Sequence, residues 1–379
     1  HGYALAKVEL PPATLHPNET LLDVSFQVFS GPQLDIGPIT LSGLHDMNED
    51  FVRHRMRLQP GQRFTPEAIE QARSDLAALG VFSVVRAVPA DQADAEGRLP
   101  LTIDVTERPL HAVDLNAAYS TDLGVNVGAG WHHRNLFGDA EQLNLTGAVQ
   151  LGGTAVRKPG YVFGAQFIKP DFLALDQSLE IDLGAVKQSL DAYDQNALTQ
   201  KIAINRKLST HWLVGAGLTG EEERIRQEGV SSRYNLIGLP VTAKYDDTNN
   251  LFDPTTGMRA AFTVTPMQSL TGQTATFLIL QASGSTYFDL AGNGRSVLAL
   301  RALVGQELGV GSAFSLPPDQ RFYAGGSGTV RGYRYQSIGP QFPDDRPTGG
   351  TAVSAGSVEF RQRILDKYGV VAFVDAGQV

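Results

Sequence analysis

The chain has 379 residues, a formal charge of −9 and no cysteine. The lack of cysteine excludes disulfides, cysteine nucleophiles and cysteine-ligated zinc, and the acidic balance argues against a general nucleic-acid binder. No apolar run approaches the roughly 18 residues of a transmembrane helix, and we expect no signal peptide at the N-terminus.

The first 34 residues are predicted to be the end of a mixed helix-and-strand module. The stretch "GYALAKV" at 2–8 resembles the end of a helix. The stretch "LLDVSFQVF" at 21–29 alternates apolar and polar residues, as a strand does. A short link at Gly31 and Pro32 then leads into the next module.

Residues 35–109 are predicted to form a complete module in the order strand, helix, helix, strand, strand. A first helix should follow Asn48. A second should start at Thr65, which is a good N-cap followed by proline. Gly80 is the expected C-terminal cap of that helix. The helix has an apolar face at helical spacing, and the strands have alternating patterns: Ile69, Ala72, Leu76 and Leu79 for the helix, and 37–44, 81–89 and 99–107 for the strands.

From about residue 110 the helical patterns stop and long alternating strands follow. Many of these strands reach ten residues, the length that crosses a bilayer at a tilt, and so many strands favour closure over an open sheet. We therefore predict an antiparallel transmembrane β-barrel over 110–379, with a soluble β-rich domain as the alternative. The expected strands are 112–119, 124–133, 141–151, 161–169, 178–185, 195–205, 211–223, 232–245, 258–268, 275–289, 296–307, 351–363 and 368–379.

Some stretches have the composition of catalytic or ligand-binding motifs, but their residues do not match the spacing of those motifs. The glycine-rich run 324–340 lacks the spacing of a P-loop, a dinucleotide-binding loop or a nucleophile elbow. The acidic stretches 45–50 and 245–257 do not fit a calcium loop. His132 and His133 are adjacent and point to opposite faces of a strand. We therefore predict a protein that is not an enzyme, with no metal, nucleotide or other cofactor.

One carboxylate near the C-terminus requires a partner. Asp375 lies in a strand that is apolar on both faces, and an unpaired buried carboxylate is costly. The alternative is that it faces a water-filled lumen. A connection of roughly forty residues precedes the last two strands, and connections of such length are usually functional or disordered. Its Arg331 offers a planar charged fork that suits a carboxylate. On the strand before Asp375, one face carries Ser357, Glu359, Arg361 and Arg363.

Several motifs together resemble one family. The run "GGSGTVRGYRYQSIGP" at 325–340 resembles the V-R-G-F/Y signature of outer-membrane assembly factors, which join periplasmic POTRA domains to a barrel of sixteen strands. The stretches 247–259, 356–364 and 369–379 resemble further motifs of the same family, and residues 36–108 resemble a POTRA domain. The likeness therefore extends over nearly the whole chain.

The resemblance implies a domain order and a set of site residues. Residues 1–34 would be the C-terminal part of one POTRA domain, 35–109 a complete one, and 110–379 a C-terminally incomplete barrel with about thirteen of the sixteen strands. A loop would fold back into the lumen, and its arginine would pair with Asp375 and Glu359. The implied loop motif is Gly325, Gly326, Gly328, Val330, Arg331, Gly332 and Tyr333, and the implied first strand of a lateral seam carries His111, Val113, Leu115, Ala117 and Tyr119.

The function that the resemblance implies is assembly of outer-membrane proteins. The motifs at 331–340 and 370–379 look most like TamA-type subunits, which act in autotransporter biogenesis. The alternatives are a BamA-type general insertase and a two-partner secretion or porin-like polypeptide channel. The expected partners are unfolded outer-membrane clients, a TamB-like periplasmic protein and the lipid bilayer, with no nucleic acid. The barrel would lie in the bacterial outer membrane and the POTRA domains in the periplasm.

Overall fold

The computed structural model describes residues 2–9, 14–16, 21–24, 26–271 and 276–379. These residues form two units, which are considered separately. One comprises residues 1–111 with 133–142, and the other comprises 112–132 with 143–379. No helix in the described ranges is long and apolar enough to cross a membrane.

The N-terminal segment contains short strands. The strands β1 (Lys7–Glu9) and β4 (Gln27–Phe29) pair antiparallel, as do β2 (Thr14–His16) and β3 (Leu21–Asp23). The prediction of a helix end at 2–8 is therefore wrong. The chain makes one turn between Tyr3 and Ala6 and then enters β1, whose pairing with β4 requires an extended backbone. The single strand predicted at 21–29 is divided into β3 and β4.

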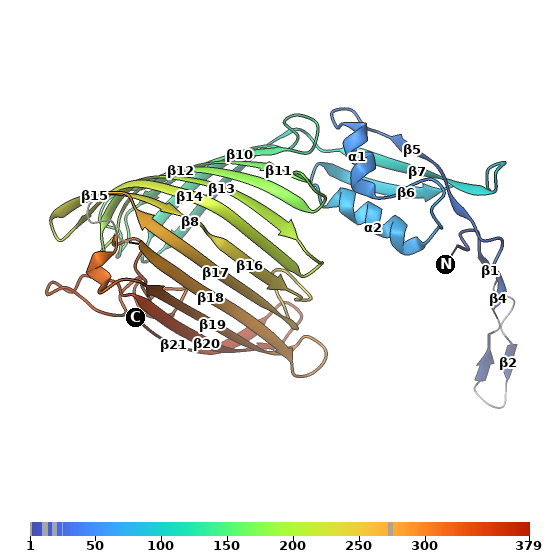
Figure 1. Cartoon of the computed structure of the whole chain (residues 1–379). Coiled ribbons are helices and arrows are strands. Elements are labelled where there is room, and N and C mark those ends of the chain that lie inside the picture. The colour runs from blue at the N-terminus through green and yellow to red at the C-terminus, as the bar shows by residue number, and fades with distance from the viewer. Residues whose placement is uncertain (1, 10–13, 17–20, 25, 272–275) are drawn as a thin grey trace. The chain divides into compact units, whose positions relative to one another are not determined.

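The complete module of the first unit has the predicted order of elements. It contains β5 (Asp35–Ser42), α1 (Glu49–Met56), α2 (Pro66–Ala77), β6 (Phe82–Pro89) and β7 (Arg98–Glu107). The sheet order is β5-β7-β6, with β5 parallel and β6 antiparallel to β7. Thr65 caps α2, because its Oγ1 accepts a hydrogen bond from the Ala68 amide at 3.3 Å. The two helices cover the sheet around a buried core that includes Ile36, Val52, Leu76, Leu99 and Ile103 (Figure 1).

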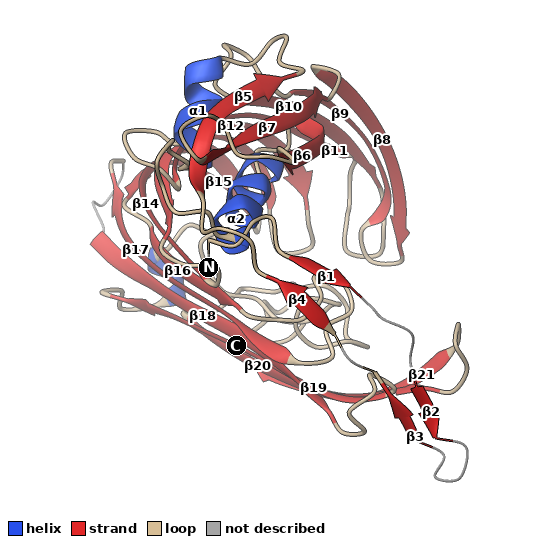
Figure 2. Cartoon of the chain, turned by 90° about the vertical axis from the view of Figure 1, so that its right-hand side faces the viewer, coloured by secondary structure: helices blue, strands red, loops and turns tan. Residues whose placement is uncertain are grey.

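The second unit is one large antiparallel sheet of 14 strands, which curls on itself (Figures 1 and 2). Neighbours in sequence are neighbours in the sheet, except that β15 and β16 share one position. The strands are β8 (His111–Ser120), β9 (Gly124–His133), β10 (Gln142–Leu151), β11 (Gly160–Lys169), β12 (Gln177–Ser189), β13 (Asp194–Lys207), β14 (Trp212–Gln227), β15 (Val230–Gly238), β16 (Val241–Asp246), β17 (Gly257–Ser269), β18 (Thr276–Asp289), β19 (Ser296–Leu308), β20 (Ala352–Arg363) and β21 (Gly369–Gln378).

The strand predicted at 232–245 is interrupted in the structure. The ladder stops at Leu239 and Pro240, and β15 and β16 each pair with β14 and β17. Proline has no amide proton for the ladder, so this residue breaks the pairing. The prediction of one continuous strand here is therefore wrong, although the position in the sheet is retained.

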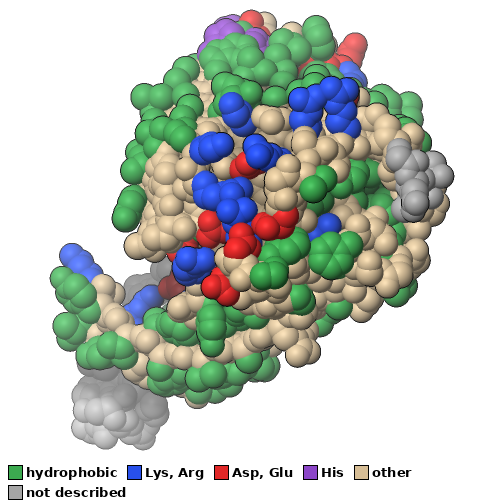
Figure 3. Space-filling model, turned by 90° about the vertical axis from the view of Figure 1, so that its left-hand side faces the viewer, with side chains coloured by type: hydrophobic (Ala, Val, Ile, Leu, Met, Phe, Trp, Pro, Cys, Tyr) green, Lys and Arg blue, Asp and Glu red, His purple; other side chains and the backbone are tan. Residues whose placement is uncertain are grey.

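The two faces of the large sheet differ in polarity. On one face apolar side chains are left exposed, for example Leu183 (54%), Ile202 (51%) and Val358 (51%). On the other, hydrogen bonds join side chains across six strands, from Asp114 on β8 to Lys201 on β13. Figure 3 shows charged side chains of both signs gathered near the centre of one face, with hydrophobic ones around them. An apolar outside and a polar inside are the pattern of a membrane barrel.

Candidate functional site

The long connection between β19 and β20 is an ordered loop. It contains a short 3-10 helix, Ala313–Ser315, and a closed tip from 324 to 338. The Ile338 amide donates to the Ala324 carbonyl at 2.9 Å, which closes the tip. Tyr323 and Tyr335 pack against a buried cluster that includes Tyr193 and Ile225. The loop is therefore fixed both by its own backbone and by the barrel wall.

The loop lies on the concave side of the sheet. Gln320 donates to Glu221 on β14 at 3.1 Å, while Arg331 contacts β20 and β21. These strands are far apart in the sheet order, with β15 to β19 between them. One loop can reach both only from inside the curled sheet.

Arg331 binds two adjacent strands through all three nitrogens of its guanidinium. Its Nε and Nη2 donate to the two oxygens of Asp375 at 2.7 and 2.8 Å, which is the bidentate geometry. Its Nη1 donates to Glu359 at 2.7 Å and its Nη2 to Ser357 at 2.9 Å. The Arg331 amide also donates to Asp375 at 2.9 Å, so both side chain and backbone are held.

The register of the strands explains why one arginine reaches all three partners. Ser357 lies opposite Asp375 in the β20–β21 ladder, and Glu359 lies opposite Phe373. The guanidinium carbon of Arg331 lies 3.5 Å from the centre of the Phe373 ring, a cation–π contact. The hydrogen bonds from Arg331 to Asp375 raise the pKa of the arginine above its ordinary value. The side chain of Asp375 is only 2% exposed, so its charge depends on this cation.

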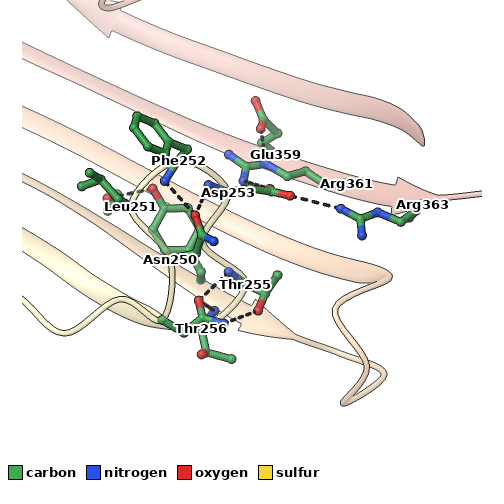
Figure 4. Close-up of polar contacts among 12 residues, drawn as sticks. Asn250, Leu251, Phe252, Asp253, Thr255, Thr256, Glu359, Arg361 and Arg363 are labelled. Carbon is green, nitrogen blue, oxygen red and sulfur yellow. Dashed lines mark hydrogen bonds and ion pairs between the residues drawn. The ribbon is translucent and has the colours of Figure 1, made fainter. Parts of the chain in front are cut away.

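The ion pairs continue from Arg331 toward the opposite end of β20. Arg361 donates to Glu359 at 2.8 Å and lies 3.7 Å from Asp253, and Arg363 donates to Asp253 at 3.2 Å (Figure 4). Asp253 belongs to the turn 247–256 between β16 and β17. Asn250 shapes this turn by accepting hydrogen bonds from the Phe252 and Asp253 amides, both at 2.9 Å. From the sequence, this stretch was predicted not to be a calcium loop.

Asp253→Asn is expected to have a small effect. The side chain of Asp253 is 59% exposed, and ion pairs of that exposure contribute about 0.5 kcal/mol. Urea unfolding of the purified protein should show a loss of that size, and the loss should disappear in high salt. Asp366→Asn, which removes a charge from the neighbouring turn 364–368, is the matched control. A loss above about 2 kcal/mol, insensitive to salt, would show that the turn is more tightly coupled to β20 than its exposure indicates.

The remaining residues of the predicted loop motif have different surroundings. Val330 is buried (3% exposed), whereas the side chain of Tyr333 is exposed. Gly325, Gly326 and Gly332 have φ values of 109°, 90° and 88°. Gly328 has no such backbone angle, and a Cβ added there would have no atom within 4 Å. The loop tyrosines that pack against the barrel wall are therefore Tyr323 and Tyr335, and not Tyr333.

The predicted seam residues lie on β8, which stands at one end of the sheet order. His111 falls in the first unit. The other predicted seam residues belong to the barrel-forming unit. Val113, Leu115 and Tyr119 are 70%, 81% and 75% exposed. On the other face of β8, Asp114 interacts with His132 at 2.6 Å.

These features define an outer-membrane β-barrel protein with a periplasmic POTRA domain. The Omp85 superfamily domain matches residues 135–379, and POTRA, the surface antigen variable number repeat, matches residues 34–108. The first match covers well over half of the chain. The chain therefore belongs to the Omp85 superfamily.

Curated relatives have low identity over most of the chain. The outer membrane protein assembly factor BamA of Neisseria meningitidis serogroup B is 22% identical over 369 residues, which cover 91% of this chain and 45% of that protein. The sorting and assembly machinery component 50 homolog of Xenopus tropicalis is 26% identical over 374 residues, covering 90% of this chain and 75% of that protein. The chain thus spans less than half the length of the Neisseria BamA.

Solved structures share the fold. BamA from Haemophilus ducreyi lacking POTRA domains 1–3 superposes with a TM-score of 0.76 at 20% identity, covering 100% of this chain and 77% of that one. CdiB from Acinetobacter baumannii gives a TM-score of 0.63 at 14% identity, covering 99% of this chain and 68% of that one. At these identities the likeness shows the fold alone.

Proposed function

We propose that this chain assembles client proteins into the outer membrane, as a TamA-type factor whose clients include autotransporters. The contact of Arg331 with Asp375 and Glu359 carries the proposal, because it fixes a long loop inside the barrel. A barrel sheet that is fixed from the lumen by this loop can stay folded while its edge strand pairs with a client. The motifs at 331–340 and 370–379, which resemble TamA-type subunits, support the subtype.

The proposed domain order assigns residues 1–34 to a preceding POTRA domain and 35–109 to a complete one, with the barrel at 110–379. The antiparallel pairs β1–β4 and β2–β3 support the first assignment. They stand where a module of this order would have its final hairpin, as β6 and β7 do in the complete module.

The POTRA domain offers an edge to an extended partner. β6 is an edge strand of the sheet order β5-β7-β6, and its Val84 and Val88 are 39% and 48% exposed. An extended segment can add to such an edge through main-chain hydrogen bonds. We propose unfolded clients and a TamB-like periplasmic protein as the segments that bind there.

The proposed route to the membrane passes along β8. Its apolar side chains at Val113, Leu115 and Tyr119 are exposed, and an edge strand of this kind templates pairing. A client strand that pairs with β8 would place its own apolar face in lipid. The gain from that burial drives insertion, so we propose no nucleotide and no cofactor.

Deleting the gene and quantifying the outer-membrane proteins of the source bacterium tests this function. The expected result is a selective loss of autotransporters, restored by the wild-type gene. An equal loss of all barrel proteins would replace the TamA-type assignment by a BamA-type one. An unchanged profile of barrels and autotransporters would reject the proposal.

A secretion channel is the second candidate, because the fold also superposes on CdiB. The internal loop argues against an open pore, since it contacts both β14 and β20 from inside. Conductance in planar bilayers separates the two functions. A large, steady conductance together with export of one dedicated substrate would favour the channel.

A further inference from the structure

Three carboxylates meet where the base of the internal loop touches the barrel wall. Glu221 and Glu223 point inward from β14, and Asp319 comes from the loop. One oxygen from each of the three lies within 4.8 Å of the others. This cluster is separate from Arg331 and its partners, and neither the family likeness nor the sequence motifs predicted it.

Two neutral side-chain amides donate hydrogen bonds to one oxygen of each carboxylate in the cluster. Gln195 donates to Glu223 at 2.8 Å and to Asp319 at 3.1 Å. Gln320 donates to Glu221 at 3.1 Å and to Asp319 at 2.9 Å. These amides orient the carboxylates but add no positive charge.

The amides bind one oxygen of each carboxylate, and two of the other three oxygens are buried. Within the described part of the chain, Glu223 Oε1 and Asp319 Oδ1 are buried and accept no hydrogen bond from an amide, a hydroxyl or a cation. Glu223 is only 3% exposed, so water does not easily solvate it. A buried carboxylate oxygen without a partner is costly, and it points to a missing ligand.

The nearest loop cation is already engaged. Arg321 donates to the carbonyls of Leu316 and Thr348 and to the side-chain oxygen of Gln227. Each of these acceptors is neutral, so Arg321 forms no direct pair with the cluster.

We propose that Glu221, Glu223 and Asp319 bind one divalent cation, with calcium preferred. Calcium takes oxygen ligands at about 2.3–2.6 Å, so ligands on opposite sides of it lie about 4.6–5.2 Å apart. The three oxygens lie within 4.8 Å of one another, so one ion can contact all of them. Magnesium demands near-ideal octahedral geometry and gives up its waters reluctantly, whereas calcium accepts an irregular set of carboxylate oxygens, which is why calcium is preferred. The bound ion would link the base of the loop to β14.

Calorimetric titration of the full chain with calcium chloride tests the site. The protein is purified in detergent free of lipopolysaccharide and stripped with a chelator. We expect one calcium per chain, at least tenfold weaker binding in Glu223→Gln, and unchanged binding in Glu222→Gln, whose side chain lies on the exposed face of the same strand. Calcium should also raise the thermal midpoint of the wild type and of Glu222→Gln, but not of Glu223→Gln.

The proposal is overturned if the stripped wild-type protein binds no calcium, or if Glu223→Gln binds it equally well. Stability that rises on acidification and ignores calcium would show instead that shared protons neutralise the cluster. Should Glu223→Gln fail to fold, Asp319→Asn provides the second variant, and the wild-type titration decides by itself whether a site exists.

Discussion

Arg331→Glu is expected to abolish client assembly and to destabilise the folded barrel. The substitution removes the cation from Asp375, whose side chain is 2% exposed, and places a third carboxylate beside Asp375 and Glu359. Leaving one buried charge without its partner costs about 3 kcal/mol or more. Outer membranes from the variant strain should contain fewer autotransporters, and the variant should lose its heat-modifiable migration on gels at a lower temperature.

Arg334→Glu is the matched control for this substitution. Arg334 lies three residues further along the same loop and pairs with Asp191 at 3.2 Å, but its side chain is 56% exposed. Exposed pairs contribute about 0–1 kcal/mol, so this variant should keep most of its activity. Equal losses in both variants would mean that net charge on the loop, and not the contact with Asp375, is what assembly requires.

Gly325→Ala is expected to disrupt the tip of the internal loop. Gly325 has a φ of 109°, and an added Cβ would lie 2.3 Å from the backbone oxygen of Arg334. A left-handed backbone costs other residues about 1–2 kcal/mol, and a clash with backbone atoms cannot be relieved by a rotamer change. Because the tip positions Arg331, we expect loss of assembly and a lower midpoint in urea unfolding.

Gly328→Ala gives a stringent comparison in the same tip. An added Cβ at Gly328 would meet no atom within 4 Å. Its effect on the free energy of unfolding should stay within about 0.5 kcal/mol, as for other unconstrained surface positions. If both alanines are tolerated, the tip does not adopt the tight closed form between Ala324 and Ile338.

The large sheet could be predicted from the sequence because side chains alternate along every strand. The alternation at 178–185, for example, puts Leu183 outward and Asp182 inward. Alternation says nothing about where a ladder is broken, and the signal for this break was Pro240 itself, which lacks the amide proton that the ladder needs. The N-terminal helix end was wrong because a seven-residue pattern can be satisfied by a turn and a short strand.

The candidate site was only partly accessible from the sequence. The cost of burying Asp375 in an apolar strand suggested an arginine partner, and the family motif indicated Arg331. The Asp253 contacts were missed, because their partners lie 108 and 110 residues away and nothing in the local pattern pairs them. The cluster of Glu221, Glu223 and Asp319 was not predicted, because alternation cannot tell which inward side chains a loop will cover.

A double-mutant cycle between Arg331→Glu and Asp375→Arg tests the central claim most directly. The claim is that direct pairing of these two residues holds the loop inside the barrel and that assembly depends on it. The cycle measures the free energy of unfolding and the amount of autotransporter in the outer membrane for both single variants and the double variant. We predict that each single variant is defective and that the double variant regains a substantial part of both properties. A double variant that is no better than the sum of the two defects would contradict the account.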